Sequence, residues 1–148
     1  MTRSATTWLK AALLVAAACQ CQAAQACADP VFECVIQSSG KQVQVCQNGD
    51  ALHYSFGPRE GEPELSLQRP LTQVTIEPWN GMGERYWSSL EMRNGAWSYR
   101  MAVSYQRGAQ ADDDVRGSLT VLKQGQAVRE LVCLPDTVRE RIESVLTP

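Results

Sequence analysis

The sequence contains few of the residues from which catalytic and metal sites are usually built. Among its 148 residues there is one histidine, His53, and it stands between the apolar positions of an alternating segment. The sequence also lacks a Gly-x-Ser-x-Gly elbow, a Cys-x-x-Cys pair and a glycine loop followed by Lys-Ser/Thr. These absences argue against a serine hydrolase, a thiol redox centre and a nucleotide site. We therefore predict a protein that is not an enzyme and that binds no cofactor or metal.

Long apolar runs are equally scarce. One such run, residues 11–18, follows Arg3 and Lys10, and Ala24-Gln25-Ala26 then supplies the small-x-small pattern that a signal peptidase cuts. The run is far shorter than the ~20 residues needed to cross a bilayer. We therefore predict a signal peptide over residues 1–26, a single mature domain over residues 27–148, no membrane span and a periplasmic location.

The cysteine count supports this cleavage site. Of six cysteines, Cys19 and Cys21 belong to the predicted leader. The four that remain are Cys27, Cys34, Cys46 and Cys133. An even number in an oxidising compartment predicts two disulfides. The alternative is a lipoprotein in which Cys19 carries lipid, but the aliphatic residue of a lipobox is missing and five cysteines would be left.

Positive charge is in the minority. Without Arg3 and Lys10 the mature chain has 12 basic residues against 16 acidic ones, a net charge of −4. This balance argues against nucleic acid and anionic lipid as partners, and it leaves a basic protein as a possible partner.

Alternation with a period of two dominates the mature chain, as in Leu52, Tyr54 and Phe56, and we expect these three side chains to be buried. Nine segments are predicted to be strands: 31–37, 41–47, 51–56, 64–68, 72–77, 84–92, 99–105, 118–123 and 127–134. The breaks carry turn residues such as Asn48-Gly49 and Asn94-Gly95. This pattern predicts an all-β fold, an antiparallel meander of about eight or nine strands that forms a barrel or a sandwich.

One short C-terminal helix is also predicted. Pro135-Asp136 provides a helix start, and Val138, Ile142 and Val145 share one helical face. We expect this helix to cover one end of the β-structure.

The strand register predicts the disulfide pairing. A turn centred on Ser39-Gly40 directs Cys34 towards the core and Cys46 to the opposite face. The apolar face in this register consists of Phe32, Cys34, Ile36, Val43 and Val45. The register therefore favours a Cys34–Cys133 bond and a Cys27–Cys46 bond. The local pair Cys34–Cys46 remains an alternative, which requires a bulge or a three-residue loop.

The segment 79–87 has the most unusual local composition, with two glycines and several residue types that anchor protein interfaces. Its candidates for partner binding are Trp79, Arg85 and Tyr86. For Trp79 and Arg85 a role in capping the core is an equal alternative, and for Trp87 core capping is the preferred interpretation.

Two acidic tips complete the candidates. The first contains Glu60, Glu62 and Glu64, and the second is formed by Asp112, Asp113 and Asp114. The aspartates lack the spacing of an EF-hand loop, so we predict no calcium site. Solvated turns explain both tips, and rim charges that speed association with a basic partner would be a second use.

Phe32-x-Cys34, Lys41-x-Val43-x-Val45 and Cys133 resemble the small periplasmic inhibitors of c-type lysozyme. The resemblance implies a disulfide-linked eight-stranded barrel that inserts a loop into the lysozyme cleft. The Ser-Gly-x-x-Tyr loop of that family is not matched, because Val43 stands where its tyrosine is expected. In size and predicted location the chain is also similar to periplasmic immunity proteins.

The resulting prediction is an exported protein-binding module, an inhibitor or immunity factor for a basic cell-envelope enzyme such as a lysozyme-like hydrolase. The alternative is a β-barrel that binds a small apolar or glycan ligand in its interior. A cavity of several hundred cubic ångströms would support the alternative.

Overall fold

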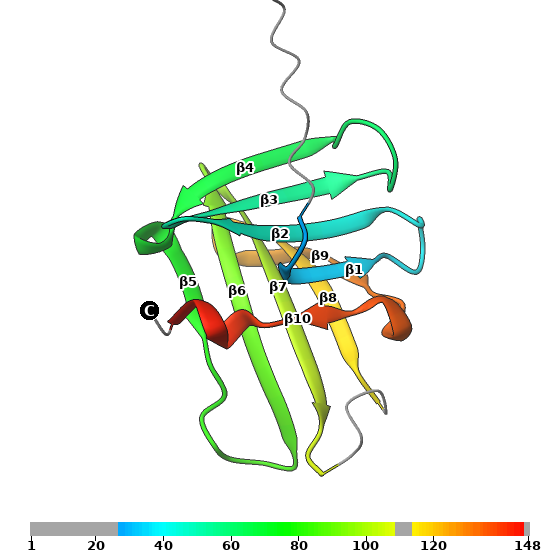
Figure 1. Cartoon of the computed structure of the whole chain (residues 1–148), viewed down its shortest axis with the longest axis vertical. Helices are drawn as coiled ribbons and strands as arrows, with labels where there is room; N and C mark the ends of the chain where they lie inside the picture. Colours follow the sequence, from blue (N-terminus) through cyan, green and yellow to red (C-terminus); the bar gives the residue numbers. More distant parts are fainter. Residues whose placement is uncertain (1–26, 109–113, 147–148) are drawn as a thin grey trace, which may run out of the picture.

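A computed structural model describes residues 27–108 and 114–146, which form two five-stranded antiparallel sheets packed face to face (Figure 1). The first sheet contains, in spatial order, β10 (Arg139–Glu140), β1 (Pro30–Val35), β2 (Gln42–Asn48), β3 (Ala51–Gly57) and β4 (Leu65–Pro70). The second contains β5 (Val74–Glu77), β6 (Arg85–Asn94), β7 (Trp97–Gln106), β8 (Arg116–Lys123) and β9 (Gln126–Val132). The predicted all-β antiparallel fold is confirmed, with a sandwich in place of a closed barrel.

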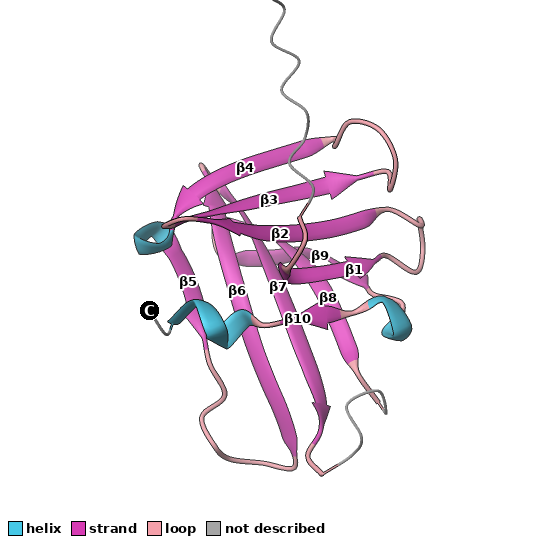
Figure 2. Ribbon diagram, viewed as in Figure 1, coloured by secondary structure: helices cyan, strands magenta, loops and turns pink. Residues whose placement is uncertain are grey.

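Each of the nine predicted strands is present, and the chain moves from one sheet to the next through the 3-10 turn η1 (Leu71–Gln73) between β4 and β5. Strands β1 to β4 of the first sheet run across strands β5 to β8 of the second, as Figure 2 shows. Because the strands fall into two separate sheets, they do not form one closed barrel. The structure therefore also differs from the eight-stranded barrel that the lysozyme-inhibitor resemblance implies.

The predicted C-terminal helix is wrong. The segment forms two 3-10 turns, η2 (Pro135–Thr137) and η3 (Ile142–Leu146), on either side of the two-residue strand β10. In β10, Glu140 pairs with Phe32 at the edge of β1, so the backbone finds its hydrogen bonds in the sheet. A helix this short is marginal alone. The predicted apolar face is still used, because Ile142 is fully buried in the core.

The core lies between the two inner faces. Leu52 and Tyr54 are fully buried from the first sheet, and Leu90 and Met101 from the second. The rings of Tyr54 and Tyr99 stack across the interface with centroids 5.3 Å apart. Phe56, which was expected to be buried, is only half-buried because it lies at the end of β3, where the Lys41 ammonium sits 5.6 Å from its ring centroid.

The register of β1 and β2 preserves the predicted apolar face. Cys34 lies opposite Val43, so the turn is centred between Ser38 and Ser39 and not between Ser39 and Gly40. Moving the centre by one residue shifts the pairing by two, which leaves every side chain on the same face.

The two disulfides join Cys34 to Cys133 and Cys27 to Cys46, each with a Cα–Cα distance of 5.7 Å. This is the pairing that the register favours, and the alternative Cys34–Cys46 bond is not formed. The Cys34–Cys133 bond ties the first sheet to the end of β9. Two disulfides indicate an oxidising, extracytoplasmic compartment. Within the described ranges, no helix is long and apolar enough to cross a membrane.

Candidate functional site

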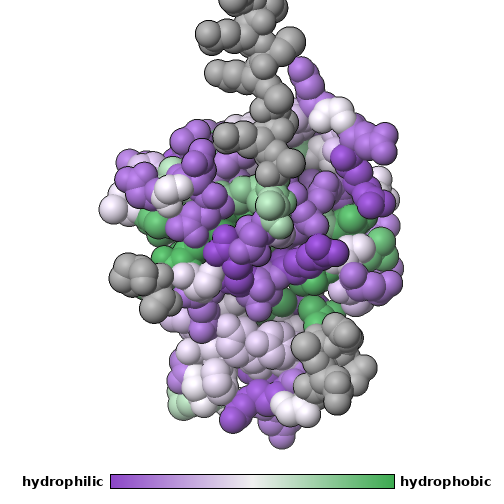
Figure 3. Space-filling view, in the orientation of Figure 1, coloured by the Kyte–Doolittle hydropathy of each residue, from purple (hydrophilic) through white to green (hydrophobic). Residues whose placement is uncertain are grey.

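The second sheet extends past the first at one end. β6 and β7 have ten residues each, whereas no strand of the first sheet exceeds seven. The excess length of β6 and β7, together with the loop that precedes β6, projects below the crossing strands in Figure 1. Figure 3 shows this end as a pale area of intermediate hydropathy beneath the strongly hydrophilic face of the first sheet.

Aromatic side chains cluster at this projecting end. Tyr86 and Tyr105 lie opposite each other in the register, and their rings stack with centroids 4.5 Å apart. The Trp79 ring lies 5.7 Å from the Tyr86 ring in a tilted arrangement. The Arg107 guanidinium lies 4.8 Å from the Trp79 ring centroid, which is a cation–π contact. We call the residues Trp79, Met82, Tyr86, Tyr105 and Arg107 the aromatic end.

The loop that carries Trp79 is held by its own hydrogen bonds. The Trp79 indole N–H donates to the carbonyl of Met82 at 2.9 Å, and the Met82 N–H donates to Oδ1 of Asn80 at 3.0 Å. Arg107 adds a bond from its guanidinium to the carbonyl of Gly83 at 3.2 Å. Gly83 has a φ of 89°, a conformation that other residues rarely adopt. The loop is therefore ordered around Met82, whose exposed fraction is 70%.

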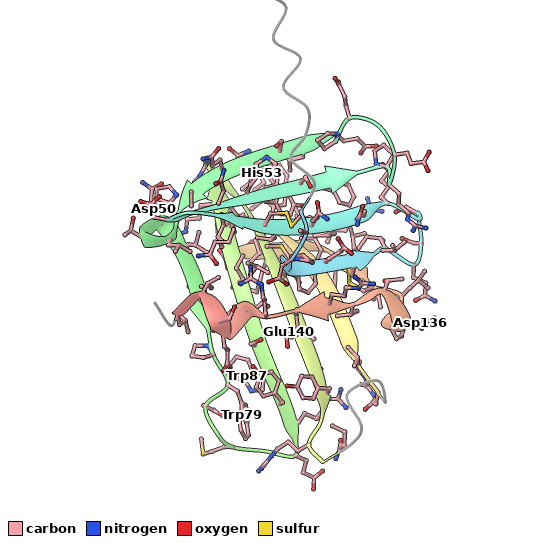
Figure 4. The ribbon with its side chains drawn as sticks, in the orientation of Figure 1. Asp50, His53, Trp79, Trp87, Asp136 and Glu140 are labelled. Carbon is pink, nitrogen blue, oxygen red and sulfur yellow. A yellow bond between two sulfur atoms is a disulfide. The ribbon has the colours of Figure 1, made fainter. Side chains whose placement is uncertain are left out.

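The C-terminal segment supports the same loop from the other side. The carboxylate of Glu143 accepts a hydrogen bond from the Trp79 backbone N–H at 2.8 Å. Glu140 lies on β10, above Trp79 in Figure 4. The 3-10 turn η3 thus acts as a clamp on a loop that is 64 residues away in sequence.

The C-terminal segment places the negative charges of Glu140 and Glu143 on the inner side of the aromatic end. Burial, with Glu143 as the next contribution, raises the pKa of Tyr86 far above its ordinary value. Burial and the charges of Glu140 and Glu143 raise the pKa of Tyr105. Burial also raises the pKa of Glu140, and the Glu143 charge adds to that effect. Burial disfavours any isolated charge here, and the carboxylates of Glu140 and Glu143 favour a positive group over a negative one.

Arg85, a predicted anchor, lies on the other face of the hairpin from Tyr86. Its guanidinium pairs with the Asp114 carboxylate and donates to the Ser104 hydroxyl at 3.3 Å. Arg116 contacts the same carboxylate at 3.2 Å, and the bonds from Arg85 and then Arg116 hold the pKa of Asp114 below its usual range. The structure thus brings Trp79 and Tyr86 together and places Arg85 in a separate ionic group with Asp114.

The structure does not bring the remaining acidic candidates into the aromatic end. Asp112 and Asp113 lie outside the described residues. At the other acidic tip, Glu64 pairs with Lys41 at 2.8 Å, far from the aromatic end. His53, the single histidine, is exposed on β3 and shares a hydrogen bond of 2.8 Å with the Ser66 hydroxyl.

A second feature is a cavity of about 460 Å³ on the outer face of the second sheet. Its floor follows one register row across all five strands: Glu77, Ser89, Ala102, Ser118 and Val132. Trp87, Ser104 and Arg116, from the adjacent row, line one side of it. We call this feature the outer pocket.

Trp87 was expected to cap the core, and that expectation is wrong. The inner face of β6 carries the even-numbered residues Ser88, Leu90 and Met92, all fully buried, so Trp87 points outwards. The parity of Trp87 relative to Leu90 was visible in the sequence. Tyr105, Arg107 and Glu143 carried no such local signal, because distant segments bring them to the aromatic end.

The chain matches no protein-family model, no curated protein and no solved structure.

Proposed function

We propose that the protein is an exported, periplasmic protein-binding module that engages a basic envelope protein through its aromatic end, as an inhibitor or immunity factor. The observation that carries this proposal is the exposure of Met82 on a loop fixed by Trp79, Arg107 and Glu143. A fixed loop loses little conformational entropy on binding, which favours affinity. Aromatic residues, methionine and arginine are also enriched at protein interfaces.

The charge of the site supports a basic partner. Glu140 and Glu143 lie close enough to the tyrosine rings that their charges add to the effect of burial in raising the pKa of Tyr105. A lysine or arginine side chain from a partner would find ring faces and carboxylates together at this position. The two disulfides support an extracytoplasmic place of action.

The proposal can be tested by titrating a basic hydrolase, a c-type lysozyme, with the mature protein and following both binding and cell-wall lysis. In parallel, basic periplasmic proteins retained by the immobilised protein are assayed for loss of activity in the complex. Trp79→Ala should weaken binding about thirtyfold, equivalent to 2 kcal/mol, because it removes a ring and releases the Met82 loop. Met82→Ser should weaken it by about tenfold.

The matched control is Trp97→Ala. Trp97 lies at the opposite end of β7 and is 40% exposed, so its loss should leave binding unchanged. If no basic hydrolase binds at about 10 µM, or if Met82→Ser and Trp97→Ala have equal effects, the aromatic end is not a protein-binding site.

A further inference from the structure

The outer pocket has a floor of unusually small side chains. Ser89, Ala102 and Ser118 lie side by side on the three central strands, β6, β7 and β8, in one register row. Central strands normally favour β-branched and aromatic residues, whereas alanine is depleted in them. The next row along the same face is filled, because Arg100 and Glu91 form an ion pair of 2.7 Å there. The small residues therefore leave a hollow where large ones would have stabilised the sheet.

The walls of the pocket combine one aromatic ring with polar groups. Trp87 is half-buried and belongs to the adjacent row with Ser104. The Ser89 hydroxyl donates to the Glu77 carboxylate at 3.2 Å, and Glu130 contributes a second carboxylate to the lining. Arg116 also lines the pocket, but its guanidinium contacts Asp114 at 3.2 Å.

These groups exclude two classes of ligand. An anion would face the carboxylates of Glu77 and Glu130, and the Arg116 guanidinium contacts the Asp114 carboxylate, which it shares with Arg85. A wholly apolar ligand would cover the Glu77 carboxylate and the Ser118 hydroxyl without offering either group a hydrogen bond, which is costly. A ligand of this pocket must therefore donate hydrogen bonds to carboxylates, exchange them with serines and present an apolar face to the indole.

A neutral saccharide meets these three requirements. We propose that the outer pocket is a saccharide-binding site, in which Trp87 stacks on the apolar face of a sugar ring and Glu77 and Glu130 accept its hydroxyl groups. Its volume of about 460 Å³ lies in the range of small-molecule sites. The site lies on a different face from the Met82 loop, so it does not depend on the proposed protein-binding function.

The experiment is isothermal titration of the mature protein with maltose, cellobiose, lactose and N,N′-diacetylchitobiose. At least one should bind with a Kd on the order of 1 mM, as expected for a small, open site. Ala102→Leu fills the floor without removing a polar group, and it should abolish binding. Trp87→Ala should weaken binding at least tenfold.

Two controls separate a binding site from a structural effect. Trp97→Ala removes a tryptophan from β7 outside the pocket lining and should leave the Kd unchanged. The melting temperature of Ala102→Leu shows whether the sheet remains folded, and if it does not, Ser118→Val provides a smaller filling of the same floor. No binding of any of the four saccharides at about 20 mM overturns the proposal. Binding that survives both filled variants, or tighter binding of an amine such as spermidine, also overturns it.

Discussion

β6 and β7 pass from a region enclosed by the first sheet into a region that projects beyond it, and their inward-facing side chains change at the boundary. In the enclosed half, Leu90 and Met101 are fully buried. In the projecting half, the corresponding positions are Tyr86 and Tyr105, which are half-buried. The alternation continues through both halves, but the residue type changes with solvent exposure. Aliphatic side chains occupy the fully buried positions, and amphipathic tyrosine rings occupy the positions where one side remains exposed to solvent. The enclosed half stabilises the fold, and the projecting half presents a surface.

The largest effect on the free energy of unfolding is expected when the disulfides are removed. Replacing Cys34 and Cys133 by Ala should lower the free energy of unfolding by about 4.7 kcal/mol, because the bond spans a sequence separation of 99. Replacing Cys27 and Cys46, with a separation of 19, should cost about 3 kcal/mol. Urea denaturation measures both. A larger cost for the shorter loop would contradict the chain-entropy explanation.

A cavity between the sheets in the enclosed half should lower the free energy of unfolding nearly as much as loss of a disulfide. Leu90→Ala should lower the free energy of unfolding by about 3 kcal/mol, since the side chain is fully buried between the sheets. Phe56→Ala is the matched comparison at the rim of the core, and it should cost about 1–2 kcal/mol because its ring is half-buried. Equal costs in urea denaturation would show that burial in the two positions does not differ as described.

In the projecting half, substitutions should affect local order more than global stability. Glu143→Ala removes the acceptor for the Trp79 N–H and should lower the free energy of unfolding by about 1–2 kcal/mol. Hydrogen exchange should reveal faster exchange at the Trp79 amide, while amides of β2 and β3 remain protected. Leu146→Ala, on the same turn, serves as control because this side chain is 52% exposed. Unchanged exchange at Trp79 would show that η3 does not clamp the loop.

The smallest effect on stability should come from substitution of Glu140. Burial raises its pKa in the folded state, so folding favours the protonated form. The resulting stability is fully present below the unfolded pKa of about 4.3 and is lost as the pH rises through the folded pKa. Glu140→Gln should therefore raise the melting temperature slightly at pH 7, and this gain should disappear below about pH 4. A gain that is independent of pH would point to packing and not to charge.

The sequence predicted those features that depend on neighbours in the chain. Alternation correctly identified the inward faces of β2 and β3, including Val43, Val45 and Tyr54, because strand geometry fixes this parity locally. Gly-containing turns marked the ends of the strands. Strand β10 was not predicted, because its two residues form a strand only through their pairing with β1. The spacing of the apolar residues around them equally suits a helix. Non-local pairing overrode the local pattern.

The candidate sites follow the same rule. Trp79 and Tyr86 were found because they share one segment of unusual composition. Arg107 and Glu143 were missed, since the register of β6 with β7 and the docking of η3 bring them to the loop. The outer pocket could be recognised only from the register of four strand pairs. Within its own strand, none of the small residues has an unusual sequence context.

If the predicted signal peptide exports the chain, the bond between Cys34 and Cys133 also sets an order of events during biogenesis. A chain that crosses a membrane from its N-terminus exposes Cys27, Cys34 and Cys46 to oxidants while Cys133 is still on the other side. Cys34 must therefore remain a free thiol until Cys133 arrives, or form a non-native disulfide with Cys27 or Cys46 that is later broken by thiol–disulfide exchange. Maturation of this small domain would then be limited by disulfide isomerisation, and its yield should depend on the isomerase supply of the compartment that receives it.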